Sequence, residues 1–171
     1  MSSIECIIAD ITTQQADAMV MPAHKHLIRG RGLSAQVFDK IGAPLRHACE
    51  QCPPCSVGEA VTTPAFNLPY QYIIHTVTPQ WSSGDISGSS DLTLLTRCYH
   101  SAITEAAEKG CKRVIFAALG AGTNHFPQAL SAHQGLAVLQ SFTEQFDSIK
   151  ICLANVEAQH IWQETQQRYY H

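Results

Sequence analysis

The chain has 171 residues, of which 45% are hydrophobic and 15% are charged, and its formal net charge is −3. This length suits one domain of about 100–200 residues, and the acidic balance disfavours binding to nucleic acid through overall charge. No apolar run approaches the ~20 residues of a membrane helix, and the first residues lack the features of a secretory signal. Seven cysteines, an odd number, favour reduced thiols over a disulfide framework. We therefore expect a single cytoplasmic domain over residues 1–171, with a small-molecule or protein-borne ligand and neither membrane nor nucleic acid as partner.

Apolar strands alternate with helices along the chain. A loop containing glycine and arginine leads into the first helix, for which Ser34 is the predicted N-cap. The proline-containing segment after this helix must be irregular, because proline removes backbone donors. A polar loop at 82–90 precedes a helix that ends at Gly110, a favourable C-cap. The predicted strands are 4–9, 18–21 (closed by Pro22), 59–63, 72–77, 113–119 and 149–153, and the predicted helices are 34–49, 92–109, 127–146 and one from about 156.

The internal strands are continuous apolar runs rather than alternating ones. This pattern, together with the alternation of strands and helices, indicates an α/β fold whose sheet is covered on both faces. The sequence contains no internal repeat and no low-complexity tract, which agrees with one domain.

A glycine-containing stretch, Phe116-Ala-Ala-Leu-Gly-Ala-Gly-Thr-Asn-His-Phe-Pro127, combines a buried strand with a loop. Gly120 and Gly122 allow the main chain to approach a ligand closely, and a loop between strand and helix exposes N–H groups that can hold an anion. His125 stands where a dinucleotide fingerprint has its third glycine, and the Gly-Lys-Ser/Thr of a Walker A motif is missing. The stretch is therefore either another kind of anion-binding loop or an ordinary turn.

A second glycine loop, Arg29-Gly30-Arg31-Gly32, precedes the first predicted helix. Two such loops at the ends of parallel strands could flank one diphosphate, helped by the partial positive charge of a helix N-terminus. The alternative is a basic surface turn. Asp10, which follows the first strand, either accepts a hydrogen bond from an amino group such as adenine N6 or simply forms a turn.

Four residues that can bind zinc lie close together in the sequence: His47, Cys49, Cys52 and Cys55. One short segment would have to supply all four tetrahedral ligands, which is unfavourable, so thiols are the preferred interpretation. We expect no metal and no cofactor. Hydrolase signatures are missing as well, because Ser87 comes one residue too late for G-x-S-x-G.

Taken together, these segments resemble a macrodomain, the ADP-ribose-binding module. The resemblance covers nearly the whole chain, and the order and spacing of its motifs make it specific. It implies a three-layer α/β/α sandwich with a mixed, mostly parallel central sheet, and ADP-ribose or an ADP-ribosylated protein as partner. The matching segments are Ala9-Asp10-Ile11-Thr12, the strand at 16–24, the loop and helix at 29–42, the Cys-x-x-Gly-Glu-Ala segment at 55–81, the helix at 94–110 and the second phosphate loop at 116–127.

The resemblance also implies roles for individual residues. Asp10 would bind adenine N6, and the Ile11 amide would bind the neighbouring ring nitrogen. The other ligand contacts would come from two loops: Gly30, Arg31, Gly32 and Leu33 in the first, and Gly120, Ala121, Gly122, Thr123, Asn124 and Phe126 in the second.

The sequence departs from the family's pattern near the distal ribose. Hydrolytic members carry an asparagine after the second strand and an acidic residue after the first glycine loop, and here His24 and Ser34 stand in those places. Serine cannot act as a carboxylate base, and a positioned base contributes about 10²–10⁴-fold. Slow or absent hydrolysis by the usual route is therefore predicted.

Two further departures concern the ligand contacts. Asn124 replaces the aromatic residue that packs on the distal ribose, and Phe126, two residues later, could substitute for it. Arg29 and Arg31 replace two glycines of the first loop. Their guanidinium groups could pair with the diphosphate, or they could fill the cleft.

Three functions remain open. The first is a module that binds ADP-ribose with little or no hydrolysis. The second is an ADP-ribosyl hydrolase or O-acetyl-ADP-ribose deacetylase, with His24 and Ser34 as candidate catalytic residues; His24 or His125 would then orient or deprotonate water, because imidazole titrates near ~6.5. The third is a macrodomain that has lost its ligand and binds other proteins.

Overall fold

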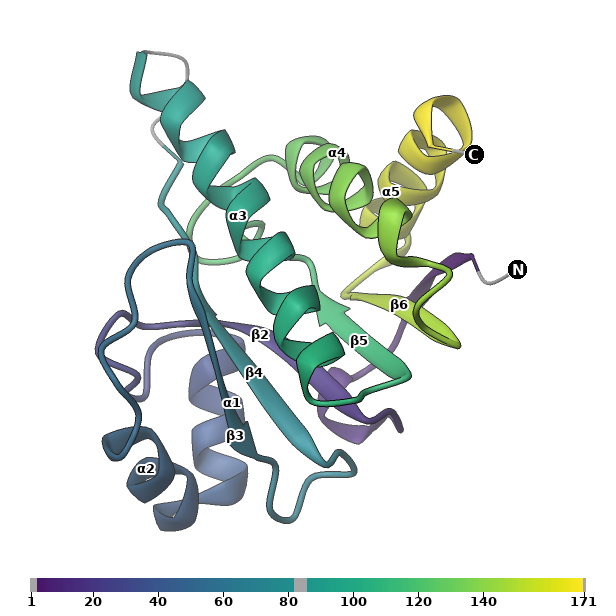
Figure 1. The fold of residues 1–171 in the computed structure, drawn as a ribbon. Coiled ribbons are helices and arrows are strands. Elements are labelled where there is room, and N and C mark those ends of the chain that lie inside the picture. The colour runs from purple at the N-terminus through teal and green to yellow at the C-terminus, as the bar shows by residue number, and fades with distance from the viewer. Residues whose placement is uncertain (1–2, 82–85, 171) are drawn as a thin grey trace.

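The fold was analysed in a computed structural model, which describes residues 3–81 and 86–170 (Figure 1). The strands are β1 (Ile4–Ile8), β2 (Ala18–Ala23), β3 (Ala60–Pro64), β4 (Tyr72–Val77), β5 (Arg113–Ala117) and β6 (Ser148–Leu153). The helices are α1 (Leu33–Ile41), α2 (Ala43–Glu50), α3 (Ile86–Glu108), α4 (Gln128–Leu139) and α5 (Val156–Tyr169), with the short 3₁₀ helices η1 (Ile11–Thr13) and η2 (Gln140–Phe142). No helix in these two ranges is both long and apolar enough to cross a membrane.

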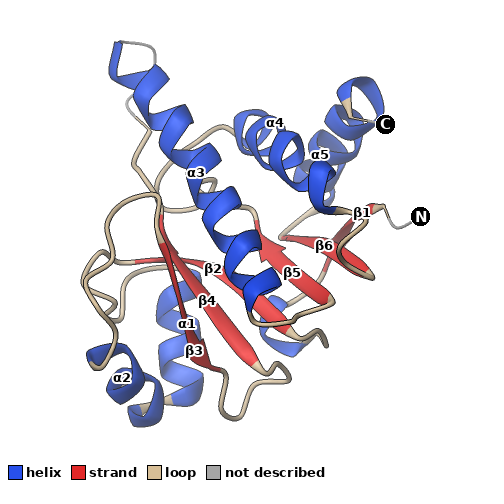
Figure 2. Cartoon of the chain, viewed as in Figure 1, coloured by secondary structure: helices blue, strands red, loops and turns tan. Residues whose placement is uncertain are grey.

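The strands form one sheet in the order β1-β6-β5-β2-β4-β3, shown in red in Figure 2. Neighbouring strands from β1 to β4 in this order run parallel, whereas β3 is antiparallel to β4. The mixed, mostly parallel sheet expected from the resemblance is therefore confirmed.

Helices cover both faces of the sheet. Along β2, Ala18 and Val20 belong to the core beneath α3, α4 and α5, whereas Met19 and Met21 belong to the core beneath α1 and α2. Alternate residues of a strand point to opposite faces, so one continuous apolar run supplies both cores. The three-layer α/β/α sandwich is confirmed, and its apolar strands follow from burial on two sides.

The helix predicted over 34–49 consists of two helices. Gly42, with a φ of 82°, ends α1, and Pro44 lies in the first turn of α2. The strand predicted to close at Pro22 continues to Ala23. Pairing of β2 with β5 stops at Val20, so Pro22 lies where one side of the strand is an edge and a missing N–H is tolerated.

Two further boundaries differ from the prediction. The polar loop expected over 82–90 overlaps α3, which begins at Ile86; residues 82–85 lie outside the described part of the chain. The helix expected over 127–146 ends at Leu139 and tightens into η2, as helix ends commonly do.

His75 lies in the middle of β4 and is 1% exposed. Its Nε2 is 2.9 Å from the Thr63 hydroxyl of β3. Burial lowers the pKa of His75 to about 4, because a charged imidazolium loses its hydration there. The folded protein therefore holds this ring neutral near pH 7.

Candidate ligand-binding site

Two glycine loops meet above the carboxyl ends of the parallel strands, where α/β proteins usually bind ligands. Residues 29–32, which we call loop 1, precede α1, and residues 119–124, which we call loop 2, follow β5. A Cβ atom added to Gly32 would lie 3.4 Å from Cγ2 of Thr123. The loops predicted from the sequence therefore approach van der Waals contact, and they enclose a cleft between them.

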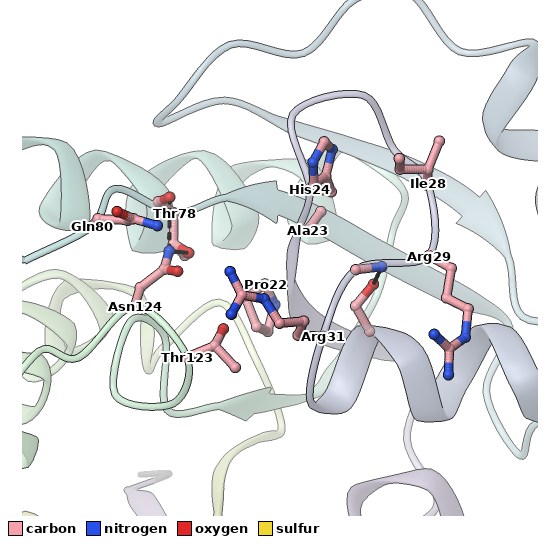
Figure 3. Close-up of a pocket in the computed structure, with 12 residues that line it drawn as sticks. Pro22, Ala23, His24, Ile28, Arg29, Arg31, Thr78, Gln80, Thr123 and Asn124 are labelled. Atoms are coloured by element: carbon pink, nitrogen blue, oxygen red, sulfur yellow. Dashed lines mark hydrogen bonds between the residues drawn. The ribbon is translucent and has the colours of Figure 1, made fainter.

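The cleft contains two cavities. The β4-side cavity has a volume of about 410 Å³ and the β6-side cavity about 290 Å³. Both are lined by Pro22, Arg31 and Thr123. The other lining residues include His24, Ile28, Gly30, Ser34, Thr78 and Asn124 on the β4 side (Figure 3) and Gly32, Leu33, Gly122, Gln128, Cys152 and Ala154 on the β6 side.

The two arginines of loop 1 point in different directions (Figure 3). Arg29 forms a bidentate pair with Asp39 of α1, at 2.8 Å from Nε to Oδ1 and 3.0 Å from Nη2 to Oδ2. Arg31 extends toward Thr123 of loop 2. Within residues 3–81 and 86–170 no hydrogen bond or ion pair occupies Arg31. The Arg31 guanidinium therefore faces loop 2, whereas the Arg29 guanidinium is paired with Asp39, although Arg29 also lines the β4-side cavity.

Loop 2 begins on a buried hydrogen-bond network. The Leu119 N–H donates to the Tyr99 hydroxyl at 3.0 Å, and the Ser131 hydroxyl donates to the Leu119 carbonyl at 2.7 Å. The two hydroxyls are 2.7 Å apart. Further along the loop, the N–H groups of Gly122 and Thr123 have no partner in the described part of the chain. Such a fixed row of free amide donors suits an anion.

Asn124 and Phe126 stabilise loop 2 from the sides. Nδ2 of Asn124 donates to the carbonyls of Thr78 and Pro79, both at 3.0 Å, and lies 2.6 Å from the Thr78 hydroxyl. Phe126 is 2% exposed, and its ring centroid is 5.2 Å from that of Trp81. Phe126 fills the space beneath loop 2 and faces the core, so the structure does not support its expected packing on a ribose.

Ser34 is not the N-cap of α1, contrary to the prediction. The chain turns at Gly32, with a φ of 61°, and Gly32 is the N-cap. Ser34 lies in the first turn, is 4% exposed, and its hydroxyl accepts a hydrogen bond from the Gly30 N–H at 3.3 Å. Its oxygen therefore shapes loop 1 while lining the β4-side cavity.

His24 lines the β4-side cavity, and its Nδ1 accepts a hydrogen bond from the His26 N–H at 3.1 Å. In the neutral ring the proton must then lie on Nε2. Nε2 can donate to a ligand, but neither nitrogen offers a free lone pair to take a proton from water. His125 is exposed, has a φ of 67° and lies at the end of loop 2.

Asp10 forms a turn and keeps one oxygen available. Its Oδ1 accepts hydrogen bonds from the Thr12 N–H at 2.9 Å and the Thr12 hydroxyl at 2.6 Å. The hydroxyl bond is the main reason why the pKa of Asp10 lies below its usual value. Oδ2 has no partner among the described residues. Asp10 is not among the residues that line the β6-side cavity, but Cys152, which does line it, donates to the carbonyl of the preceding residue Ala9 at 2.9 Å.

Ile11 follows Asp10 at the start of η1. Its carbonyl accepts a hydrogen bond from the buried Tyr70 hydroxyl. Its own N–H makes no hydrogen bond within the described ranges. These two consecutive residues therefore keep one acceptor, Oδ2 of Asp10, and one donor, the Ile11 N–H, without a partner there.

The seven cysteines are free thiols. Burial raises the pKa of Cys49 to about 11, which keeps this thiol protonated. Among residues 3–81 and 86–170, no group of three or more His, Cys, Asp or Glu side chains is arranged to hold a metal. Cys52 and Cys55 therefore have no companion ligands there.

Several cleft residues were not identified from the sequence. Thr78 and Ala154 directly follow β4 and β6, and Gln80 lies two residues after Thr78. A rule that inspects the residues after each parallel strand would have found them. Gln128 is the first residue of α4, and its Oε1 accepts a hydrogen bond from Nε1 of the buried Trp162 at 3.0 Å. This contact, which fixes the Gln128 amide beside the β6-side cavity, has no signature in the sequence.

These features define a three-layer α/β/α protein with a cleft between two glycine loops at the carboxyl ends of its strands. The Macro domain model matches residues 20–134, and the chain belongs to this family. It is 36% identical over 141 residues to a macro domain-containing protein of Lactiplantibacillus plantarum, with 82% of this chain and 80% of that protein covered. It is 31% identical to the macro domain-containing protein RSc0334 of Ralstonia nicotianae, with 88% and 86% covered.

Solved structures agree with this assignment. The Oceanobacillus iheyensis macrodomain with ADP superimposes with a TM-score of 0.87 at 25% identity, covering 96% of this chain and 90% of that one. A point mutant of the same macrodomain with ADPR gives a TM-score of 0.88, covering 96% and 91%. The family resemblance inferred from the sequence is thereby confirmed.

Proposed function

We propose that the protein binds ADP-ribose, free or attached to a protein, between loop 1 and loop 2. The observation that carries this proposal is the free amide row at Gly122 and Thr123, which faces the unpaired guanidinium of Arg31. These donors suit the two charges of a diphosphate. Binding of ADP and ADPR by the Oceanobacillus iheyensis macrodomain supports the same ligand class.

In the proposed complex, adenine lies in the β6-side cavity. Its N6 amino group donates to Oδ2 of Asp10, and the Ile11 N–H donates to a ring nitrogen. The diphosphate lies between the loops, near the N-terminus of α1, whose first amides carry a partial positive charge. The terminal ribose occupies the β4-side cavity, beside His24 and Ser34.

We also propose that hydrolysis is slow or absent by the family's usual route. Ser34 offers a hydroxyl where a carboxylate base would be needed, and His24 uses its Nδ1 lone pair on the His26 N–H. Without a general base, about 10²–10⁴-fold of rate enhancement is lost. The β4-side cavity then acts mainly as a binding pocket.

Calorimetric titration with ADP-ribose tests the binding proposal. Asp10→Asn is the sharpest variant, because Asn retains an oxygen for Thr12 but places an amide NH₂ against the adenine amino group. We expect it to weaken the binding of ADP-ribose about tenfold to a hundredfold, as for loss of one hydrogen bond to a charged group. No binding of ADP-ribose by the native protein at millimolar concentration would refute the proposal.

Incubation with a mono-ADP-ribosylated protein tests the second part. We expect the modification to stay intact over hours. Release of free ADP-ribose that His24→Ala abolishes would instead establish the hydrolase, and would show that His24 leaves its contact with His26 during turnover.

A further inference from the structure

A third cavity of about 580 Å³ adjoins the β4-side cavity and is not used by the proposed ligand. Leu27, Phe38 and Gly42 form apolar parts of its lining, and Arg46 and Glu50 of α2 add charged groups. Ile28 and Arg29 line both this cavity and the β4-side cavity. The third cavity therefore lies next to the end of the cleft that would hold the terminal ribose.

Ile28 stands on the ridge between the two cavities. It is 52% exposed, although Leu27 beside it is 6% exposed. Leu27 has a φ of 53°, a left-handed conformation that is a genuine outlier for a bulky residue. Strained backbone of this kind concentrates at binding sites. Here it turns Leu27 into the core and leaves Ile28 as an apolar contact for something outside the chain.

The charges around the third cavity leave one cation available. Arg29 forms a bidentate pair with Asp39, and Glu50 faces His47 at 3.6 Å. The Arg46 residue is exposed, and its guanidinium makes no hydrogen bond or ion pair within the described part of the chain. Its guanidinium can therefore donate to a carbonyl or a carboxylate in this cavity.

We propose that the third cavity receives the polypeptide that carries the ADP-ribosyl group. An apolar side chain next to the modified residue packs on Ile28, and Arg46 donates to carbonyl or carboxylate oxygens of the same segment. This inference rests on the proposed function, because the terminal ribose in the β4-side cavity brings its attached protein to this ridge. The preferred ligand is then a protein-borne ADP-ribosyl group rather than free ADP-ribose.

Three probes test the inference by calorimetry: free ADP-ribose and two short peptides, each ADP-ribosylated on a single serine hydroxyl. One peptide carries leucine beside the modified serine, and the other carries glycine. We expect the leucine peptide to bind about tenfold more tightly than the glycine peptide, as burial of one aliphatic side chain implies. Ile28→Ser should make the leucine peptide and the glycine peptide bind with equal affinity.

Arg46→Glu should weaken both peptides, whereas free ADP-ribose should bind as it does to the native protein. Arg46 lines only the third cavity, and it is exposed, so the variant should unfold at the native temperature. Lys109→Glu, the same charge change directly after α3, is the control. It should leave the affinities for all three probes unchanged.

The outcomes separate the two proposals. If free ADP-ribose fails to bind the native protein, the proposed function fails. The other outcome is that free ADP-ribose binds, and that both peptides bind with the same affinity as free ADP-ribose in the native protein and in both variants. Only the third-cavity inference is then overturned.

Discussion

Loop 1 and loop 2 face each other across one cleft but are held in place by different interactions. Loop 2 rests on the buried network of Tyr99, Ser131 and the Leu119 backbone. Loop 1 is held by an exposed ion pair between Arg29 and Asp39 and by a hydrogen bond of 3.3 Å from the Gly30 N–H to the Ser34 hydroxyl. Buried hydrogen bonds are costly to leave unmade, whereas exposed pairs contribute little. The rigid loop therefore supplies fixed amide donors, and the weakly held loop supplies a charge that can adjust to the ligand.

The largest expected effect is on the free energy of unfolding, and it comes from His75 in the sheet that supports both loops. His75 has a pKa of about 4 in the folded protein, below the ordinary value near ~6.5. As the pH falls, His75 therefore binds a proton in the unfolded chain before it does so in the folded protein. The neutral ring contributes its full amount to the free energy of unfolding above pH ~6.5. This contribution is lost between that pH and about 4, at about 1.4 kcal/mol per pH unit and roughly 3 kcal/mol in total.

Urea unfolding at several pH values measures this effect. Other groups also titrate in this range, so the comparison is with His75→Gln, which can still bond to Thr63. The native protein should lose stability more steeply than the variant between pH 6.5 and 4. Equal slopes would show that His75 is not held neutral by burial.

Tyr99→Phe tests the support of loop 2 alone. It leaves the buried Leu119 N–H without its acceptor, and we expect a loss of about 2 kcal/mol in the free energy of unfolding. Arg29→Ala, the matching change under loop 1, should lower the free energy of unfolding much less, because an exposed ion pair contributes little. Equal losses in chemical denaturation would contradict the difference between the loops.

Arg31→Ala tests the charge that loop 1 carries into the cleft. Arg31→Ala should weaken the binding of ADP-ribose about tenfold, because it removes a guanidinium paired with the diphosphate. This loss of affinity should be smaller at high salt. Lys109→Ala is the control, because this exposed cation lines neither cavity of the cleft. Tighter binding after Arg31→Ala would show that this side chain obstructs the ligand.

The smallest expected effect comes from relief of the backbone strain at His125, directly after loop 2. His125 has a φ of 67°, which glycine adopts without a steric penalty. His125→Gly should raise the free energy of unfolding by about 0.5 kcal/mol, because relief of the strain slightly exceeds the added entropy of the unfolded chain. Unchanged affinity for ADP-ribose would show that the imidazole is not needed, whereas weaker binding would place it in the site.

The fold could be predicted because it depends on patterns that are local in sequence. Continuous apolar runs mark strands buried on two faces, and the run at 72–77 corresponds to β4. Gly42 was missed as a helix break although the signal was there, since Pro44 favours the start of a new helix. The extension of β2 through Pro22 depends on where β5 stops pairing, and no local pattern contains that information.

The site was predictable to the level of its loops but not of its side chains. The glycines identified loop 1 and loop 2, since close main-chain approach requires them. The opposite directions of Arg29 and Arg31 depend on Asp39, which lies on α1 beyond the loop. The burial of Phe126 depends on Trp81, far away in the sequence. Contacts between distant segments decide which side chains face a ligand.

The pairing of β1 with β6 has a consequence for folding. Ile4 lies beside Ile149, and Ile8 beside Leu153, so β1 pairs with a strand that lies far from it in the sequence. Such long-range pairing folds slowly. Asp10 directly follows β1, so the proposed contact with adenine depends on one of the slow steps of folding.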